Sequence, residues 1–217
     1  MSTVERKPVK QRKSIYSPHP SIAYALAVIA NMKSTTGRSL EEWVAFIEKH
    51  GPAGEAARRE WLKREHELGS NYVGYLAAAS VGKGDDFSDA DKYLEVAERY
   101  VEDMYAGPKA ALRPMYDKLL EVGRGMAKDI KVCPCQTMVP FFREHVIAQI
   151  KPATKTRIDF GLALGKYKGK LPKRLIDTGG AAKKDRITHK IELTALDQID
   201  GELLQWLKVA YDLDAGG

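Results

Sequence analysis

The feature of this sequence that most constrains its fold is a change in hydrophobic period close to Val132. Before that residue, apolar side chains recur every three to four positions, which is typical of amphipathic helices. After it, runs of β-branched and aromatic residues are separated by short polar connections, which is typical of strands. The chain is therefore predicted to be α+β, with an N-terminal all-helical bundle followed by a C-terminal antiparallel sheet covered by helices.

Several helices are predicted in the first part of the chain. Ser39 and Glu42 have the spacing of a capping box, and the helix that they begin should end at Gly51 and Pro52. The residues from Ile22 to Met32 are almost all apolar, so they predict a mostly buried helix. Further helices are expected near residues 54–68, 71–81, 88–105 and 109–127.

The strand signals of the second part are short and closely spaced. Strands are expected over residues 132–142, 146–151, 157–164 and 187–193, and a terminal helix should follow the N-cap residue Asp200. Residues 165–185 are rich in glycine and lysine, so they predict a long loop or a pair of loose β-wings.

Composition along the chain suggests three parts. Residues 1–20 are basic, contain three prolines and few apolar side chains, and are expected to form a flexible arm. We expect a helical domain over residues 21–106 and an α+β domain over residues 108–217. The boundary is placed at Gly107 and Pro108, because this pair ends a helix and the charge balance changes there.

Charge is unevenly distributed between these parts. Residues 14–106 hold 10 Lys and Arg against 15 Asp and Glu, whereas residues 107–217 hold 20 against 13. A cluster of this kind attracts polyanions, so we predict a nucleic-acid-binding or regulatory module that is not an enzyme. The candidate nucleic-acid-binding residues are Lys151, Lys155, Arg157, Lys166, Lys168, Lys170, Lys173, Arg174, Lys183, Lys184 and Arg186.

A second hypothesis assigns the C-terminal domain a small anionic ligand. In this alternative a pocket between sheet and helices, in a binding protein or an enzyme, brings together Thr154, Lys155, Arg157 and His189. Under either hypothesis the helical domain is free to dock a protein partner.

The sequence offers no motif for a cofactor or a metal. No nucleophile elbow, zinc-protease helix or dinucleotide-binding turn occurs, and the five histidines are scattered. Cys133 and Cys135 are separated by one residue, which predicts two reduced cysteines rather than a disulfide or a four-ligand zinc site, and hence a cytoplasmic protein. The longest apolar run, Ile22–Ala30, is far shorter than the roughly 20 residues of a membrane span, so no membrane is expected as a partner.

Parts of the chain also resemble known families. The stretches Ile150–Leu164 and Thr188–Leu193, with the helix Leu203–Tyr211, resemble an uncharacterised bacterial domain family with no assigned activity. The same order of strands resembles the YjbR/MmcQ proteins, which have a frataxin-like α+β fold and a proposed double-wing mode of DNA binding. Upstream, Thr36–Trp43 and Glu60–Lys63 resemble a helical module of unknown function that commonly precedes such a domain.

The resemblance therefore implies a two-domain protein with a DNA-binding wing. It does not imply a frataxin-like metal carrier, because the final domain is basic where a cation carrier should present acidic side chains.

Overall fold

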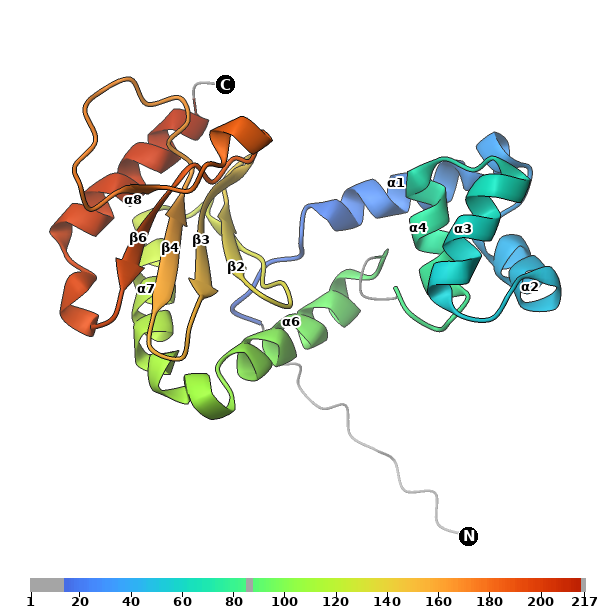
Figure 1. Ribbon diagram of the computed structural model, residues 1–217, viewed down its shortest axis with the longest axis horizontal. Coiled ribbons are helices and arrows are strands. Elements are labelled where there is room, and N and C mark those ends of the chain that lie inside the picture. The colour runs from blue at the N-terminus through green and yellow to red at the C-terminus, as the bar shows by residue number, and fades with distance from the viewer. Residues whose placement is uncertain (1–13, 85–87, 216–217) are drawn as a thin grey trace, which may run out of the picture.

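The computed structural model describes residues 14–84 and 88–215, and its architecture is α+β, as predicted (Figure 1). Helices come first, and a six-stranded antiparallel sheet follows them before the terminal helix. The helices are α1 (Ser21–Thr36), α2 (Leu40–His50), α3 (Glu55–His66), α4 (Ser70–Ala79), α6 (Ala90–Met104), α7 (Arg113–Met126) and α8 (Gly201–Asp214). The strands are β1 (Lys131–Val132), β2 (Val139–Phe142), β3 (Val146–Pro152), β4 (Ile158–Leu162), β5 (Ile176–Asp177) and β6 (His189–Leu193).

Helices α2, α3 and α4 pack around a small core of their own. The predicted capping box of α2 is present: the Ser39 hydroxyl accepts from the Glu42 amide at 3.3 Å, and the Ser39 amide donates to the Glu42 carboxylate at 2.7 Å. This core also takes the last part of α1, and its buried residues are Met32, Trp43, Ile47, Leu62, Val73, Leu76 and Ala77.

Helix α1 differs from the mostly buried helix that its apolar sequence predicts. Ile22 at its start packs in the core of the sheet, whereas Met32 near its end packs in the core of the helices. Between them Tyr24 and Leu26 are 53% and 48% exposed. The helix runs from one core to the other (Figure 1), so its middle turns contact neither core fully.

The sheet has the strand order β1-β2-β3-β4-β6-β5, with every neighbouring pair antiparallel. Helix α8 contacts β3 and β4, and α7 contacts α8, so these two helices cover the same face. At position 123 the close approach of α7 to β2 requires glycine, because a Cβ there would lie 2.6 Å from the Phe141 ring. The stretch predicted as one strand over residues 132–142 instead folds back on itself as the antiparallel pair β1 and β2. The Cys135 amide donates to the Met138 carbonyl at 2.8 Å and closes the turn between them.

The core of the sheet also takes residues from ahead of the expected boundary at Gly107. Helix α6 contributes Tyr93, Ala97, Val101 and Met104 to it. Residues 14–20, the described part of the predicted arm, are packed as well: the Ser17 amide donates to the Val132 carbonyl at 2.8 Å, and Tyr16 is buried. Helix α6 ends at Met104, and Gly107 and Pro108 begin a short 3-10 helix after it, but α6 still packs with the sheet. The remainder of the predicted arm, residues 1–13, lies outside the described residues.

Candidate nucleic-acid interface

The structure separates the predicted basic residues into two groups. All the lysines among them are exposed, and none has an ion pair within residues 14–84 and 88–215. The three arginines instead form ion pairs with carboxylates. The exposed lysines are Lys151, Lys155, Lys166, Lys168, Lys170, Lys173, Lys183 and Lys184.

Most of these lysines lie in residues 163–188, which we call the basic segment. It connects the end of β4 to the start of β6 and contains β5 and one short 3-10 turn. Tyr167 packs edge-on against Trp206 of α8, with ring centroids 5.3 Å apart, and Leu175 is buried in the core. Lys166 and Lys168, on either side of Tyr167, are exposed. The apolar side chains therefore fix the segment to the domain while the lysines remain in solvent.

Arg174 holds the same segment to the beginning of α8. Its Nη1 lies 2.7 Å from Asp200 Oδ2 and 2.9 Å from Glu202 Oε2, and Nη2 donates to the Gln198 carbonyl. Asp200 is also the N-cap of α8 and accepts from the Leu203 amide at 3.0 Å. That backbone hydrogen bond, with Arg174 beside it, lowers the pKa of Asp200. Arg174 is thus engaged within the protein.

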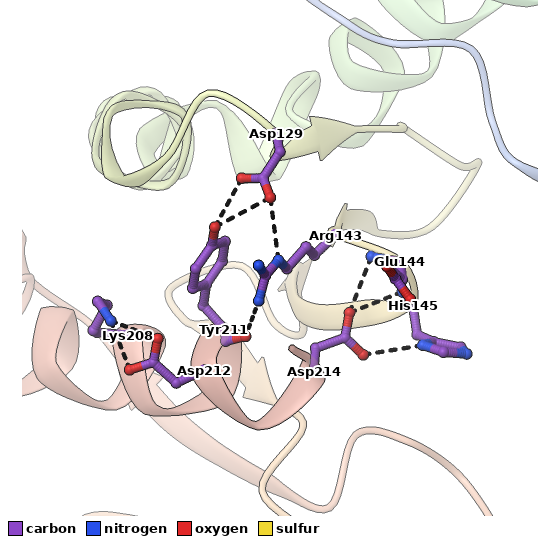
Figure 2. A network of polar contacts seen from close by, with 8 residues as sticks. All are labelled: Asp129, Arg143, Glu144, His145, Lys208, Tyr211, Asp212 and Asp214. Carbon is purple, nitrogen blue, oxygen red and sulfur yellow. Dashed lines mark hydrogen bonds and ion pairs between the residues drawn. The ribbon is translucent and has the colours of Figure 1, made fainter. Parts of the chain in front are cut away.

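Arg186 fixes the far end of the basic segment to a buried carboxylate, that of Asp214. The Asp214 side chain is 2% exposed and lies 2.7 Å from Arg186 Nη2. Asp214 Oδ2 accepts the amides of Glu144 and His145, each at 3.0 Å, and Oδ1, the oxygen that contacts Arg186, lies 3.0 Å from His145 Nδ1 (Figure 2). Burial alone would raise the pKa of Asp214, but these hydrogen bonds and the Arg186 charge hold it below its usual value.

A second set of contacts in Figure 2 ties the β2–β3 turn to the last turns of α8. Arg143 Nε lies 3.1 Å from Asp129 Oδ2, and the Tyr211 hydroxyl donates to the same carboxylate at 2.9 Å. The Arg143 guanidinium also lies over the Tyr211 ring, 4.2 Å from its centroid. The turn that donates its amides to Asp214 is therefore itself held in place.

The residues of the predicted anion pocket are not brought together. Thr154, Lys155 and Arg157 lie at the β3–β4 turn, whereas His189 pairs with Leu162 at the opposite end of β4. The two ends of β4 are four residue steps apart, a distance of about 13 Å. His189 lies beside Thr188, with Nδ1 and the hydroxyl oxygen 3.0 Å apart.

Arg157 belongs to a neutral charge network on the face of the sheet away from α7 and α8. It lies 2.9 Å from Asp159 and 3.1 Å from Glu192, and Lys190 lies 2.8 Å from each of the same two carboxylates. The two cations here pair with two anions, so the network has no net positive charge to attract an anionic ligand.

The two cysteines are reduced. The described part of the chain contains no group of three or more His, Cys, Asp or Glu side chains that could hold a metal ion. Burial raises the pKa of the Cys133 thiol to about 12, so it stays protonated at neutral pH. None of the helices among the described residues is long and apolar enough to cross a membrane.

Asp214 and Tyr167, which position the basic segment, are not among the residues predicted from the sequence. Asp214 is 28 residues from Arg186 and 69 from His145, so no local pattern indicates their contact. The sequence does give an indication of the role of Tyr167. It is an apolar ring between two lysines, and Leu171 is the next apolar residue, which is the pattern of a segment that packs through a few side chains.

The protein is thus of the α+β class, and a basic segment held in place by its own side chains lies at one end of the antiparallel sheet. Residues 101–214 match the family described as domain of unknown function DUF5655, and residues 25–80 match domain of unknown function DUF4287. The first match covers more than half of the chain, so the protein belongs to the DUF5655 family. No curated protein and no solved structure matches the chain.

Proposed function

We propose that the protein binds nucleic acid through the phosphate backbone, using the lysines of the basic segment. The observation that carries the proposal is that the arginines form ion pairs within the protein, whereas the lysines are exposed. The arginines are engaged with carboxylates of the protein, whereas Lys166, Lys168, Lys170, Lys173, Lys183 and Lys184 are exposed in one anchored segment.

The charge of the segment favours a polyanion. Its two acidic side chains, Asp177 and Asp185, accept backbone amides within the segment at 2.7 and 3.0 Å. Flexible lysines present point charges rather than the planar forks that read bases, so binding should follow phosphates and show little sequence preference. Lys151 and Lys155 lie toward the opposite end of the sheet and are not needed for this interface.

A small anion is less well supported. A cavity of about 130 Å³ lies between the basic segment and α8, and Lys166, Arg186 and Thr188 line it. Asp185 and Asp214 line the same cavity, so its two cations face two anions. An extended row of exposed lysines suits a long polyanion better than a single small one.

The resemblance to YjbR/MmcQ proteins favours DNA as the nucleic acid, and reduced cysteines agree with a cytoplasmic location. In this proposal the DUF4287 helices are available to a protein partner.

The proposal is tested by fluorescence anisotropy with a labelled DNA duplex of mixed sequence at roughly 50 mM salt. The basic-segment variant replaces Lys166, Lys168, Lys170 and Lys173 by Ala. The charge-matched control replaces four exposed lysines elsewhere, at positions 49, 63, 118 and 128. We expect the basic-segment variant to bind at least about tenfold more weakly than the wild type, and the control to bind nearly as tightly. Equal loss in both variants, or no binding by the wild type, would rule out the assigned interface.

A further inference from the structure

A second cavity, of about 360 Å³, lies where the start of α1 meets α6 and the loop between β1 and β2. It is remote in sequence from the basic segment and shares no lining residue with the smaller cavity described above. The segment ahead of α1 is fixed beside it, because Cys133 Sγ lies 3.6 Å from the Pro18 carbonyl and the His19 ring packs edge-on against Phe142. Its volume is at the lower end of the range of small-molecule sites.

The walls of this cavity are apolar and uncharged. The rings of Tyr93 and Tyr100 and the side chain of Ile22 line it, and none of the nine lining residues that the structure describes is Asp, Glu, Lys or Arg. The Tyr93 hydroxyl donates to the Pro134 carbonyl at 2.8 Å, which holds the ring and the loop together. A charged ligand would lose its hydration here without a partner charge, whereas an apolar ring would gain from burial.

His19 is among the polar residues that line this cavity. Its Nδ1 accepts from the Ser21 amide at 3.1 Å and lies 2.7 Å from the Ser21 hydroxyl. Because Nδ1 is an acceptor, the neutral ring carries its proton on Nε2. Burial lowers the pKa of His19, which favours this neutral form. Within the described residues Nε2 has no hydrogen-bond acceptor, so it can donate to a ligand.

We propose that the cavity binds a small, uncharged aromatic molecule that bears a hydrogen-bond acceptor, with its ring between Tyr93 and Tyr100 and its acceptor on His19 Nε2. Burial raises the pKa of Cys135, which also lines the cavity, so its thiol adds no charge. The site differs from the interface for nucleic acid in both location and ligand chemistry.

The test uses prodan, an uncharged naphthalene ketone whose emission responds to burial and to hydrogen bonding at its carbonyl. The full chain should bind one molecule of prodan with saturation. Thr137→Trp fills the cavity from its exposed rim and should weaken binding at least about tenfold, whereas Thr156→Trp in the exposed β3–β4 turn should leave it unchanged. His19→Phe keeps a ring but removes the donor, and should weaken binding about threefold to tenfold.

Two further measurements separate this site from other apolar surfaces. The anionic anilinonaphthalene sulfonate should bind more weakly than prodan, because neither Lys nor Arg is among the described residues that line the cavity. Leu26→Ser, on the exposed turns of α1, should leave prodan binding unchanged. Binding that survives Thr137→Trp, or that is lost with Leu26→Ser instead, would overturn the proposal. A reaction of Cys135 with N-ethylmaleimide that prodan does not slow would also count against it.

Discussion

Replacing Asp214 by Asn should loosen the attachment of the basic segment and lower the stability of the sheet domain. The buried carboxylate accepts two backbone amides and lies against Arg186 and His145. An amide oxygen can still accept the two backbone hydrogen bonds, but without the charge that makes them strong. Arg186 would then face an amide nitrogen. Since Arg186 and His145 are 41% and 55% exposed, their ion pairs contribute little, and we expect a total loss of about 2 kcal/mol.

The same variant should alter the pH dependence of stability. The pKa of Asp214 is lowered in the folded protein, so its contribution is present above the unfolded value of about 3.9 and is lost as pH falls through the folded pKa. The difference in unfolding free energy between wild type and Asp214→Asn should therefore be constant near neutral pH and shrink below about pH 4.

Urea unfolding followed by circular dichroism measures this difference. Asp212→Asn is the matched control, because Asp212 lies in the same turn of α8 but makes only an exposed ion pair with Lys208, and should change stability by less than about 0.5 kcal/mol. Equal effects of the two substitutions at pH 7, or a difference for Asp214→Asn that persists unchanged at pH 3, would contradict the role assigned to the buried carboxylate.

Gly123→Ala should destabilise the protein by about 1–3 kcal/mol in urea unfolding, because its Cβ would lie 2.6 Å from the Phe141 ring, whereas Gly125→Ala in the same helix, with open space around it, should be neutral or stabilising. Tyr16→Phe should cost about 1 kcal/mol, because it removes the buried 2.9 Å hydrogen bond to the Tyr116 hydroxyl; a melting temperature unchanged from wild type would show that this contact is dispensable. A zinc chelator should leave the melting temperature unchanged, and a large fall would reveal a structural metal.

Local patterns in the sequence were sufficient to predict the fold class and most of the elements, although the strand predicted over residues 132–142 is in fact two strands. The capping box at Ser39 and the period-2 strands are short-range signals, and both are found in the structure. Local patterns do not determine which part of the protein a helix packs against. The apolar residues of α1 predict burial, but the helix divides its contacts between two cores and leaves Leu26 in solvent.

The candidate site could be predicted only in part. Basic residues are visible in a sequence, but their pairing is not, and Arg174 and Arg186 turn out to be engaged with carboxylates 26 and 28 residues away. Likewise Arg157 and His189 are close to strands that pair, but the antiparallel register places them at opposite ends of β4. Such contacts depend on register and chain reversal, which alternation alone does not determine.

The salt dependence of DNA binding tests the central claim most directly. The logarithm of the wild-type affinity should fall linearly as the logarithm of salt concentration rises. If the four lysines of the basic-segment variant contact phosphates, they should contribute about −3.6 to that slope, or roughly 0.9 for each contact. The basic-segment variant should lose that contribution, and the control with lysines replaced at positions 49, 63, 118 and 128 should keep the wild-type slope. The same slope in both variants would contradict the assignment of phosphate binding to the basic segment.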